Sequence, residues 1–238
     1  MTTAMPVLAR RRRRTIRNVL IGIPVILGII SIVFPMYLVV VTALKTPPET
    51  ARSFFALPRS FYFGNFVEVL RKAEFLTVFR NSIYITVASA LVVAIFVPMV
   101  SYAIARNFHR PFYKSIYFLF TLGILIPFQA TMLPQIKILA KLGLMNQNGL
   151  IVMYATFSLI GNVFLQVGYI RKVPVDMEEA AHVDGASVLK TFFLVVYPMI
   201  KPIVVTTVII HTLFVWNDYL LPLLVLNKDS SMFTLPLF

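Results

Sequence analysis

The sequence contains no cysteine. Disulfide bonds, thiol catalysis, and zinc or iron–sulfur sites held by cysteine are therefore excluded, because each depends on a cysteine sulfur. Acidic residues are also scarce, with nine Asp and Glu against 22 Lys and Arg. Few candidates are left for the acid, base or metal-ligand groups that most hydrolytic sites need.

Charged residues of both signs make up only 13% of the 238 residues, whereas hydrophobic residues make up 59%. A soluble domain keeps about a quarter of its residues charged. Several apolar runs also reach the roughly 20 residues that a helix needs to cross about 30 Å of hydrocarbon. The composition and its patterning therefore predict a membrane protein.

The formal charge of +13 could indicate nucleic-acid binding, but the positions of the basic residues argue against it. Six arginines, Arg10 to Arg14 and Arg17, stand directly before the first apolar run, as the positive-inside rule describes for cytoplasmic segments. The run from Val19 to Leu44 is too long for the h-region of a signal peptide. We therefore expect a basic cytoplasmic N-terminus over residues 1–18, followed by a retained span.

Five apolar runs predict five transmembrane helices and an all-α polytopic bundle over residues 19–238. Their lengths are too great, and their hydrophobicity too continuous, for the alternating strands of an outer-membrane barrel. The expected spans are Val19 to Leu44, Ser82 to Ala105, Ser115 to Leu133, Gly149 to Ile170, and Leu194 to Trp216.

Basic residues in the short loops predict the orientation of these spans. If the spans alternate, one side of the membrane carries the N-terminal arginines together with Arg106, Arg110, Lys114, Arg171, Lys172 and Lys190. That side is expected to be the cytoplasm. The two outward segments, 45–81 and 134–148, carry basic residues as well, so the charge bias is incomplete.

A polar segment, residues 171–190, separates the fourth span from the fifth and predicts two short helices. Asp176 and Glu179 have the spacing of a capping box, so the first helix is expected to begin at Asp176. Gly185 should end it, because glycine takes the left-handed conformation without steric cost. Ser187 can cap the second helix. Such a segment is either a solvated connector or a small helical knob that fits a groove on another protein.

This loop resembles the EAA signature of importer-type ABC permeases. The residues that carry the resemblance are Glu179, Ala180, Ala181, Asp184, Gly185 and Ala186, followed by Phe193, Pro198 and Pro202. In that family the loop is the coupling helix, which sits in a cleft of a cytoplasmic ATPase. The resemblance implies that Glu179 pairs with a basic residue of the ATPase and that Gly185 sets the angle between the two helices.

The chain as a whole is similar to the carbohydrate-uptake branch, and within it to the smaller membrane subunit of maltose-type transporters. The residues that suggest this branch are Asn81 and Ser82, Leu125 to Pro127, Gly143 and Leu144, Trp216 to Asp218, and Leu221 to Leu223. The resemblance implies a second homologous permease subunit, two cytoplasmic ATPase subunits that use ATP and magnesium, and an extracytoplasmic sugar-binding protein. Subunits of this type have six spans, so a sixth span is expected to be missing here.

The absence of certain groups separates this prediction from its alternatives. No Gly-x-x-x-x-Gly-Lys-Ser/Thr phosphate loop occurs, so the chain is expected to bind no nucleotide or other cofactor itself and to be no enzyme. An integral-membrane enzyme would need intramembrane acid–base groups, and His211 is the single histidine within a span. An ion-coupled secondary transporter would usually carry an acid at mid-membrane, and the expected spans hold none. A permease for another class of solute also stays open.

Polar residues within or beside the spans are candidates for the translocation path, because an unpaired amide facing lipid is costly. The candidates are Gln129, Asn162, Gln166, Trp216 and Asn217. Hydrogen bonding between helices is the alternative role for each amide, and location at the membrane interface is the alternative for Trp216.

Overall fold

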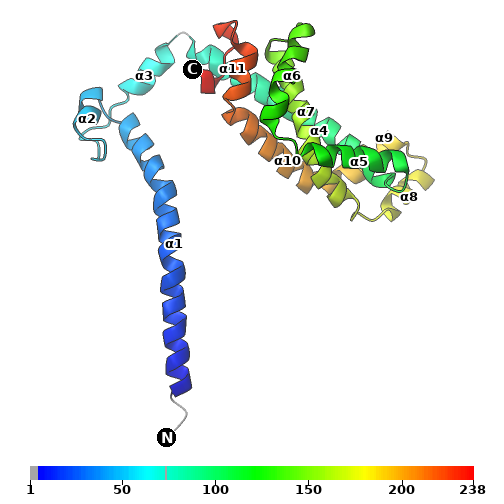
Figure 1. Ribbon diagram of the computed structural model, residues 1–238, viewed down its shortest axis with the longest axis horizontal. Coiled ribbons are helices and arrows are strands. Elements are labelled where there is room, and N and C mark those ends of the chain that lie inside the picture. The colour runs from blue at the N-terminus through cyan, green and yellow to red at the C-terminus, as the bar shows by residue number, and fades with distance from the viewer. Residues whose placement is uncertain (1–4, 73) are drawn as a thin grey trace. The chain divides into compact units, whose positions relative to one another are not determined.

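The structure, a computed structural model, describes residues 5–72 and 74–238, with side chains described for residue 18 and for residues 20–72 and 74–238. Its elements are helical throughout the described ranges, as the apolar runs predict. The chain folds as two compact units (Figure 1), the first ending at Lys72 and the second reaching to Phe238.

The first unit consists of one long helix and two short ones. Helix α1 covers Met5–Ala43, α2 covers Pro47–Arg52 and α3 covers Gly64–Arg71. The apolar stretch Leu20–Ala43 of α1 is long and apolar enough to cross a membrane, which matches the first expected span. Large hydrophobic side chains are exposed along most of it, as expected for a helix whose surroundings are lipid or other membrane helices.

The second unit is built around three long helices, α4, α7 and α10. The elements are α4 Phe75–Arg106, α5 Pro111–Gly123, α6 Phe128–Lys141, α7 Gln147–Ile170, α8 Asp176–Val183, α9 Val188–Thr191, the π-helix η1 Phe192–Val196, α10 Tyr197–Asn217, α11 Leu220–Leu226, and the 3₁₀ turns η2 Ser230–Met232 and η3 Leu235–Leu237.

Helices α4 and α7 lie side by side and run in the same direction. Near their N-terminal ends the Tyr84 hydroxyl donates to Asn148 Oδ1 at 2.8 Å, and at their C-terminal ends Arg106 Nη1 donates to the Ile170 carbonyl at 3.2 Å. Helix α10 runs the opposite way, because its Phe214 packs against Tyr154 near the start of α7. The chain must therefore return across the bundle between α4 and α7.

The expected third span, Ser115 to Leu133, is wrong as a single straight helix. The residues form α5 and α6, which are bent by 108° relative to each other. The bend follows from the local sequence, since Pro127 has no N–H to donate and stands as the N-cap of α6. Helix α5 supplies the return between α4 and α7, and α6 turns away from its axis (Figure 1).

The other expected spans are confirmed, with shifted ends. They correspond to Leu20–Ala43, Phe75–Arg106, Gln147–Ile170 and Val188–Asn217. With the bent pair counted as one crossing, the described residues hold five spans and no sixth. The largest shift is at α4, which begins seven or so residues before Ser82 because the apolar and aromatic side chains from Phe75 onward continue the helix.

Two apolar clusters hold the second unit together, one toward each end of the long helices. One cluster joins α4, α7 and α10 near the C-terminal end of α7 through Val97, Val167 and Ile200. The other joins α7 to α10 and α11 through Leu150, Val215 and Leu221. Helices α8 and α9 lie beyond the first cluster, at the far end of the bundle from α11 (Figure 1).

Candidate functional site

The first helix of the polar loop begins at the predicted residue but is held in a different way. Helix α8 covers Asp176–Val183, and the amides of Glu178 and Glu179 both donate to the Val175 carbonyl, at 2.8 and 3.0 Å. Val175 is the N-cap, and no side chain caps this end, so the predicted capping box is not formed. The acidic first turn, with Asp176, Glu178 and Glu179, favours the helix by its interaction with the helix dipole.

The end of α8 is a Schellman turn around Gly185, as the sequence predicts. Gly185 has a φ of 79°, in the left-handed region that favours glycine. Its amide donates to the His182 carbonyl at 3.0 Å, and the amide of Ala186 donates to the Ala181 carbonyl at 2.9 Å. Ser187 then caps α9, because its hydroxyl accepts a hydrogen bond from the Lys190 amide. The turn thus fixes the angle between α8 and α9.

One carboxylate of α8 is buried, and it fastens the loop to the bundle. Glu178 is only 4% exposed. Its Oε1 accepts from Arg106 Nε at 2.9 Å and forms an ion pair with Arg106 Nη2, and its Oε2 accepts from the Tyr102 hydroxyl at 2.8 Å. Arg106 and Tyr102 both belong to the last turns of α4.

The same arginine also holds the end of α7. Its Nη1 and Nη2 donate to the carbonyls of Ile170 and Val173, each at 3.2 Å. The guanidinium therefore gathers three parts of the chain, namely α4, the C-terminal end of α7 and α8. Charge-assisted hydrogen bonds of this kind are stronger than neutral ones and geometrically specific.

Beyond α9 the loop continues into the bundle without a break. The π-helix Phe192–Val196 follows α9 directly, and its Phe192 is buried against Tyr102, with ring centroids 5.2 Å apart. Pro198 has no N–H, so the α-helical bond to the carbonyl four residues earlier is missing, and the wider π turn lies just before it. Helix α9, the π-helix and α10 therefore form one continuous helical segment, Val188–Asn217.

The predicted coupling residues lie on the outside of this anchored turn. Glu179, Ala180, Asp184 and Gly185 are exposed, and Ala181 and Ala186 are half-buried. The adjacent residues Glu178 and Glu179 therefore differ in role. Glu178 faces the bundle and anchors the loop, whereas Glu179 faces away from it. Glu178 was not among the predicted site residues. Arg106 ends one span, and Glu178 lies in the next loop on the same side of the membrane. Such a pair of opposite charges could have indicated an ion pair between helix and loop.

A second candidate site is a pocket of about 240 Å³ between α7 and α10. Aromatic rings and polar groups share its lining, which is Tyr154, Phe157, Ser158, Gly161, Asn162, Ile210, His211 and Phe214. Within it Asn162 Nδ2 donates to Ser158 Oγ at 2.6 Å, and His211 Nε2 lies 3.1 Å from Ser89 Oγ on α4. Its lining combines aromatic faces with a few hydrogen-bonding groups, and its volume is below the roughly 300 to 1,000 Å³ usual for small-molecule sites, so it can hold only part of a larger solute.

The five predicted path residues are not gathered in this pocket. Asn162 lines it, whereas Gln166 is fully buried and donates to Thr207 Oγ1 of α10 at 2.9 Å. Gln129 is exposed near the start of α6. Trp216 packs edge-on against Phe79 with centroids 6.3 Å apart, and Asn217 donates to the Leu213 carbonyl of its own helix. Tyr154 and Phe157 line the pocket and were not among the predicted path residues.

At the other end of the bundle, the segment after α11 is tied to α4. Asn81 Nδ2 donates to the carbonyls of Ser231 and Phe233, at 2.8 and 2.9 Å, and Ser82 Oγ accepts from the Leu235 amide at 2.8 Å. The Tyr154 hydroxyl donates to Asp218 Oδ2 at 2.8 Å beside the start of α11. Asn81 and Ser82 thus hold the backbone of the C-terminal segment in place.

The fold and the anchored loop define a polytopic helical membrane protein that presents a rigid helical turn at one end of its bundle. Comparisons with known proteins agree with this class. Residues 98–238 match the sequence profile of the family described as binding-protein-dependent transport system inner membrane component.

Individual relatives cover most of the chain. The multiple sugar-binding transport system permease protein of Streptococcus mutans is 44% identical over 213 residues, which are 89% of this chain and 76% of that protein. The melibiose/raffinose/stachyose import permease protein of Bacillus subtilis is 34% identical over 187 residues, 78% of this chain and 67% of that protein. A bacterial ABC transporter involved in the import of the acidic polysaccharide alginate shares the fold, with a TM-score of 0.80, 24% identity, and coverage of 94% of this chain and 77% of that one.

The chain therefore belongs to the family of inner-membrane components of binding-protein-dependent transport systems. It is a multi-pass membrane protein and a transport subunit.

Proposed function

We propose that this chain is one of two membrane-spanning subunits of an ATP-driven importer for a carbohydrate. The relatives named above carry sugar or oligosaccharide transport in their names, and similarity to them extends over most of the chain. The pocket between α7 and α10, with Tyr154, Phe157 and Phe214 beside Ser158 and Asn162, has the aromatic and hydrogen-bonding groups that a sugar needs.

The proposed partners are a second homologous permease, two cytoplasmic ATPase subunits that hydrolyse magnesium-bound ATP, and an extracytoplasmic binding protein that delivers the sugar. The chain itself has no phosphate-binding loop of the Walker type. Energy for transport therefore has to come from another subunit. Extensive exposed apolar surface on the described helices leaves room for lipid and for a partner permease.

The observation that carries the proposal is the anchored turn of α8 and α9. A solvated connector does not require a buried ion pair. A segment that passes movement to membrane helices has to be joined to them rigidly. Here Arg106 and Tyr102 of α4 hold Glu178, while Glu179 and Gly185 remain exposed for a partner's groove. We assign Glu179, Ala180, Ala181, Asp184, Gly185 and Ala186 to ATPase coupling.

The proposed orientation places the α8–α9 loop and the N-terminus in the cytoplasm. The end of α4, the short loop after it and the first turn of α5 contribute Arg106, Arg110 and Lys114. The α7–α8 connection adds Arg171 and Lys172 at the same end of the second unit. By the positive-inside rule that end faces the cytoplasm. The six arginines before the first span then belong on the same side.

The direct test is reconstitution of the chain with its partner permease, ATPase and loaded binding protein in vesicles. Labelled sugar should accumulate only when ATP, the ATPase and the binding protein are all present. Transport by this chain alone, as a homodimer without an ATPase, would contradict the proposal.

A further inference from the structure

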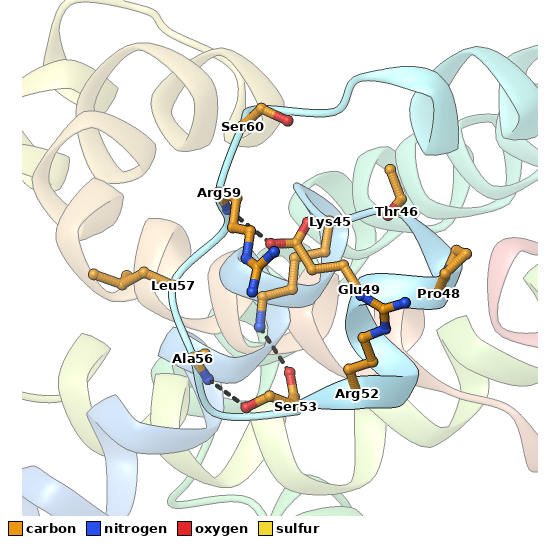
Figure 2. A pocket seen from close by; sticks show the side chains of 10 residues that line it. All are labelled: Lys45, Thr46, Pro48, Glu49, Arg52, Ser53, Ala56, Leu57, Arg59 and Ser60. Atoms are coloured by element: carbon orange, nitrogen blue, oxygen red, sulfur yellow. Dashed lines mark hydrogen bonds between the residues drawn. The ribbon is translucent and has the colours of Figure 1, made fainter.

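The first unit contains a basic pocket that the transport mechanism does not use. It has a volume of about 360 Å³ and lies within the turn that follows α1 (Figure 2). Its charged lining residues are Lys45, Arg52, Arg59 and Glu49, three cations against one carboxylate. The volume falls within the range of about 300 to 1,000 Å³ that is usual for small-molecule sites.

Lys45 is the unusual member of this group, because its side chain is only 1% exposed. Its ammonium donates one hydrogen bond, to the Ser53 carbonyl at 3.0 Å (Figure 2). In the described part of the chain, no ion pair joins it to a carboxylate. A buried cation is costly unless it is paired, and an ammonium has three N–H donors, so Lys45 is suited to receive an anion.

The two arginines add exposed donors at the same pocket. Arg52 and Arg59 are exposed, and neither guanidinium is in an ion pair among residues 18–72. Glu49 has a structural role. Its Oε1 accepts a hydrogen bond from the backbone amide of Arg59 at 2.7 Å, which closes the turn. Guanidinium groups form paired hydrogen bonds with phosphate oxygens, so this combination favours a phosphate over an uncharged ligand.

The position of the pocket indicates where that phosphate comes from. Lys45 stands two residues after the end of the apolar stretch Leu20–Ala43, where a helix that crosses the membrane would meet the headgroups. The turn also folds back onto α1, since the Phe55 ring stacks on Phe34 with centroids 6.0 Å apart and the Tyr37 hydroxyl donates to the Phe55 carbonyl at 2.9 Å. Phe34 lies about 13 Å before the end of α1, at about 1.5 Å per residue. Phe55 thus reaches back along the apolar part of α1, whereas Lys45, which follows the end of that part, places the pocket where the apolar stretch meets the headgroup layer.

Apolar side chains around the pocket complete a lipid environment. Phe54, Phe55 and Leu57 are each more than half exposed on this turn, and Leu57 lines the pocket itself. These apolar side chains offer contacts for acyl chains, while the ammonium and guanidinium groups beside them can bind an anionic headgroup. This also gives a physical reason for the basic residues of segment 45–60, which the positive-inside rule leaves unexplained.

We propose that Lys45, Arg52 and Arg59 form a binding site for the phosphate of an anionic phospholipid headgroup at the end of the first span. The site depends on the chain's being a membrane protein but not on which solute it transports. Each exposed cation that pairs with the phosphate contributes up to about fivefold in lipid affinity.

The test uses the full-length chain purified in detergent and examined by native mass spectrometry with added phosphatidylglycerol or phosphatidylcholine. The parent should retain phosphatidylglycerol preferentially, and the double variant Arg52→Gln/Arg59→Gln should lose up to about 25-fold in retention, two exposed cations at up to about fivefold each. Arg71→Gln is the matched control, because Arg71 ends α3 in the same unit but does not line the pocket. It should retain the lipid like the parent.

Two further measurements test the role of Lys45 and distinguish a lipid headgroup from free phosphate. Lys45→Met, which keeps the length of the buried side chain, should also weaken retention, and its unfolding temperature shows whether the turn is intact. Inorganic phosphate at millimolar concentration should not displace the lipid. Displacement by free phosphate, equal retention of phosphatidylcholine, or unchanged retention in the double variant would each overturn the proposal.

Discussion

Arg106 and Glu178 form a nearly buried ion pair that joins the end of α4 to the first helix of the α8–α9 loop. The two side chains are 15% and 5% exposed, and the same arginine also binds the Ile170 and Val173 carbonyls. One guanidinium thus joins α8 to α4 and to the end of α7, while α9 continues through the π-helix into α10. These contacts support the proposal that movement of the loop reaches three membrane helices.

Removing one partner of this pair should be costly. Glu178→Gln leaves Arg106 without its counter-charge in a largely buried position, so we expect a loss of about 3 kcal/mol in the free energy of unfolding. The neighbouring change Glu179→Gln is the matched control, because Glu179 is exposed and should change stability by less than about 1 kcal/mol. Denaturant unfolding of the purified chain in detergent measures both. Equal stability of the two variants would contradict the anchoring role.

A double-mutant cycle separates the ion pair from general disruption. Arg106→Met combined with Glu178→Met removes both charges, so the double variant should be less destabilised than the sum of the single variants. The expected coupling energy is on the order of 1 to 3 kcal/mol. Additive effects would show that the two residues act independently.

Gly185 should tolerate only residues that reach the left-handed region. At its φ of 79° a side chain costs roughly 1 to 2 kcal/mol, and a β-branched residue more. Gly185→Val should therefore disturb the Schellman turn and misdirect α8, while Gly185→Asn should be milder. Membrane insertion should be unchanged in both. The readout is ATP hydrolysis stimulated by the loaded binding protein, and a Gly185→Val variant as active as the parent would contradict the role of the turn.

The pocket between α7 and α10 distinguishes two amides that look alike in the sequence. Asn162 lines the pocket, whereas Gln166 is buried and bonded to Thr207. Asn162→Leu should lower sugar uptake severalfold while leaving ATPase assembly intact. Gln166→Leu should chiefly cost stability, on the order of 0.6 kcal/mol for an interhelical hydrogen bond in a membrane protein. If Gln166→Leu lowered sugar uptake and Asn162→Leu did not, the pocket would not be part of the translocation path.

Orientation can be read by accessibility labelling without background, because the chain has no cysteine. Single replacements Ser187→Cys and Ser60→Cys should react from opposite sides of the membrane. A membrane-impermeant thiol reagent applied to right-side-out vesicles should label position 60 and spare position 187. Labelling of both positions from one side would contradict the proposed topology.

The sequence was a good guide to the spans and to the turn, because both depend on local rules. Apolar length predicts a membrane helix, and Gly185 and Ser187 are residues that end and begin helices by their own chemistry. The 108° bend between α5 and α6 was missed, because hydropathy does not register a change of direction within an apolar run. Pro127 marked the place, but prolines are common in straight membrane helices as well.

The buried role of Glu178 could not be predicted from its neighbourhood in the sequence. Adjacent residues of one helix, Glu178 and Glu179, differ because one faces Arg106 some 70 residues away along the chain. Helical register alone does not say which face of α8 meets the bundle. For the same reason Gln166 and Asn162 could be nominated together as path residues, although only Asn162 lines the pocket.

Coupling to an ATPase through the exposed side of α8 is the central claim, and one substitution tests it most directly. Glu179→Ala in the reconstituted transporter should leave the chain folded and inserted but weaken ATPase docking by about 2 to 5 kcal/mol, because the partner's charge is left unpaired. Glu68→Ala, a change of the same type in α3, serves as the control and should have no such effect. The measurement is ATP hydrolysis stimulated by the sugar-loaded binding protein. The account predicts that Glu179→Ala abolishes most of the stimulation while Glu68→Ala keeps it, and full stimulation in the Glu179→Ala transporter would contradict it.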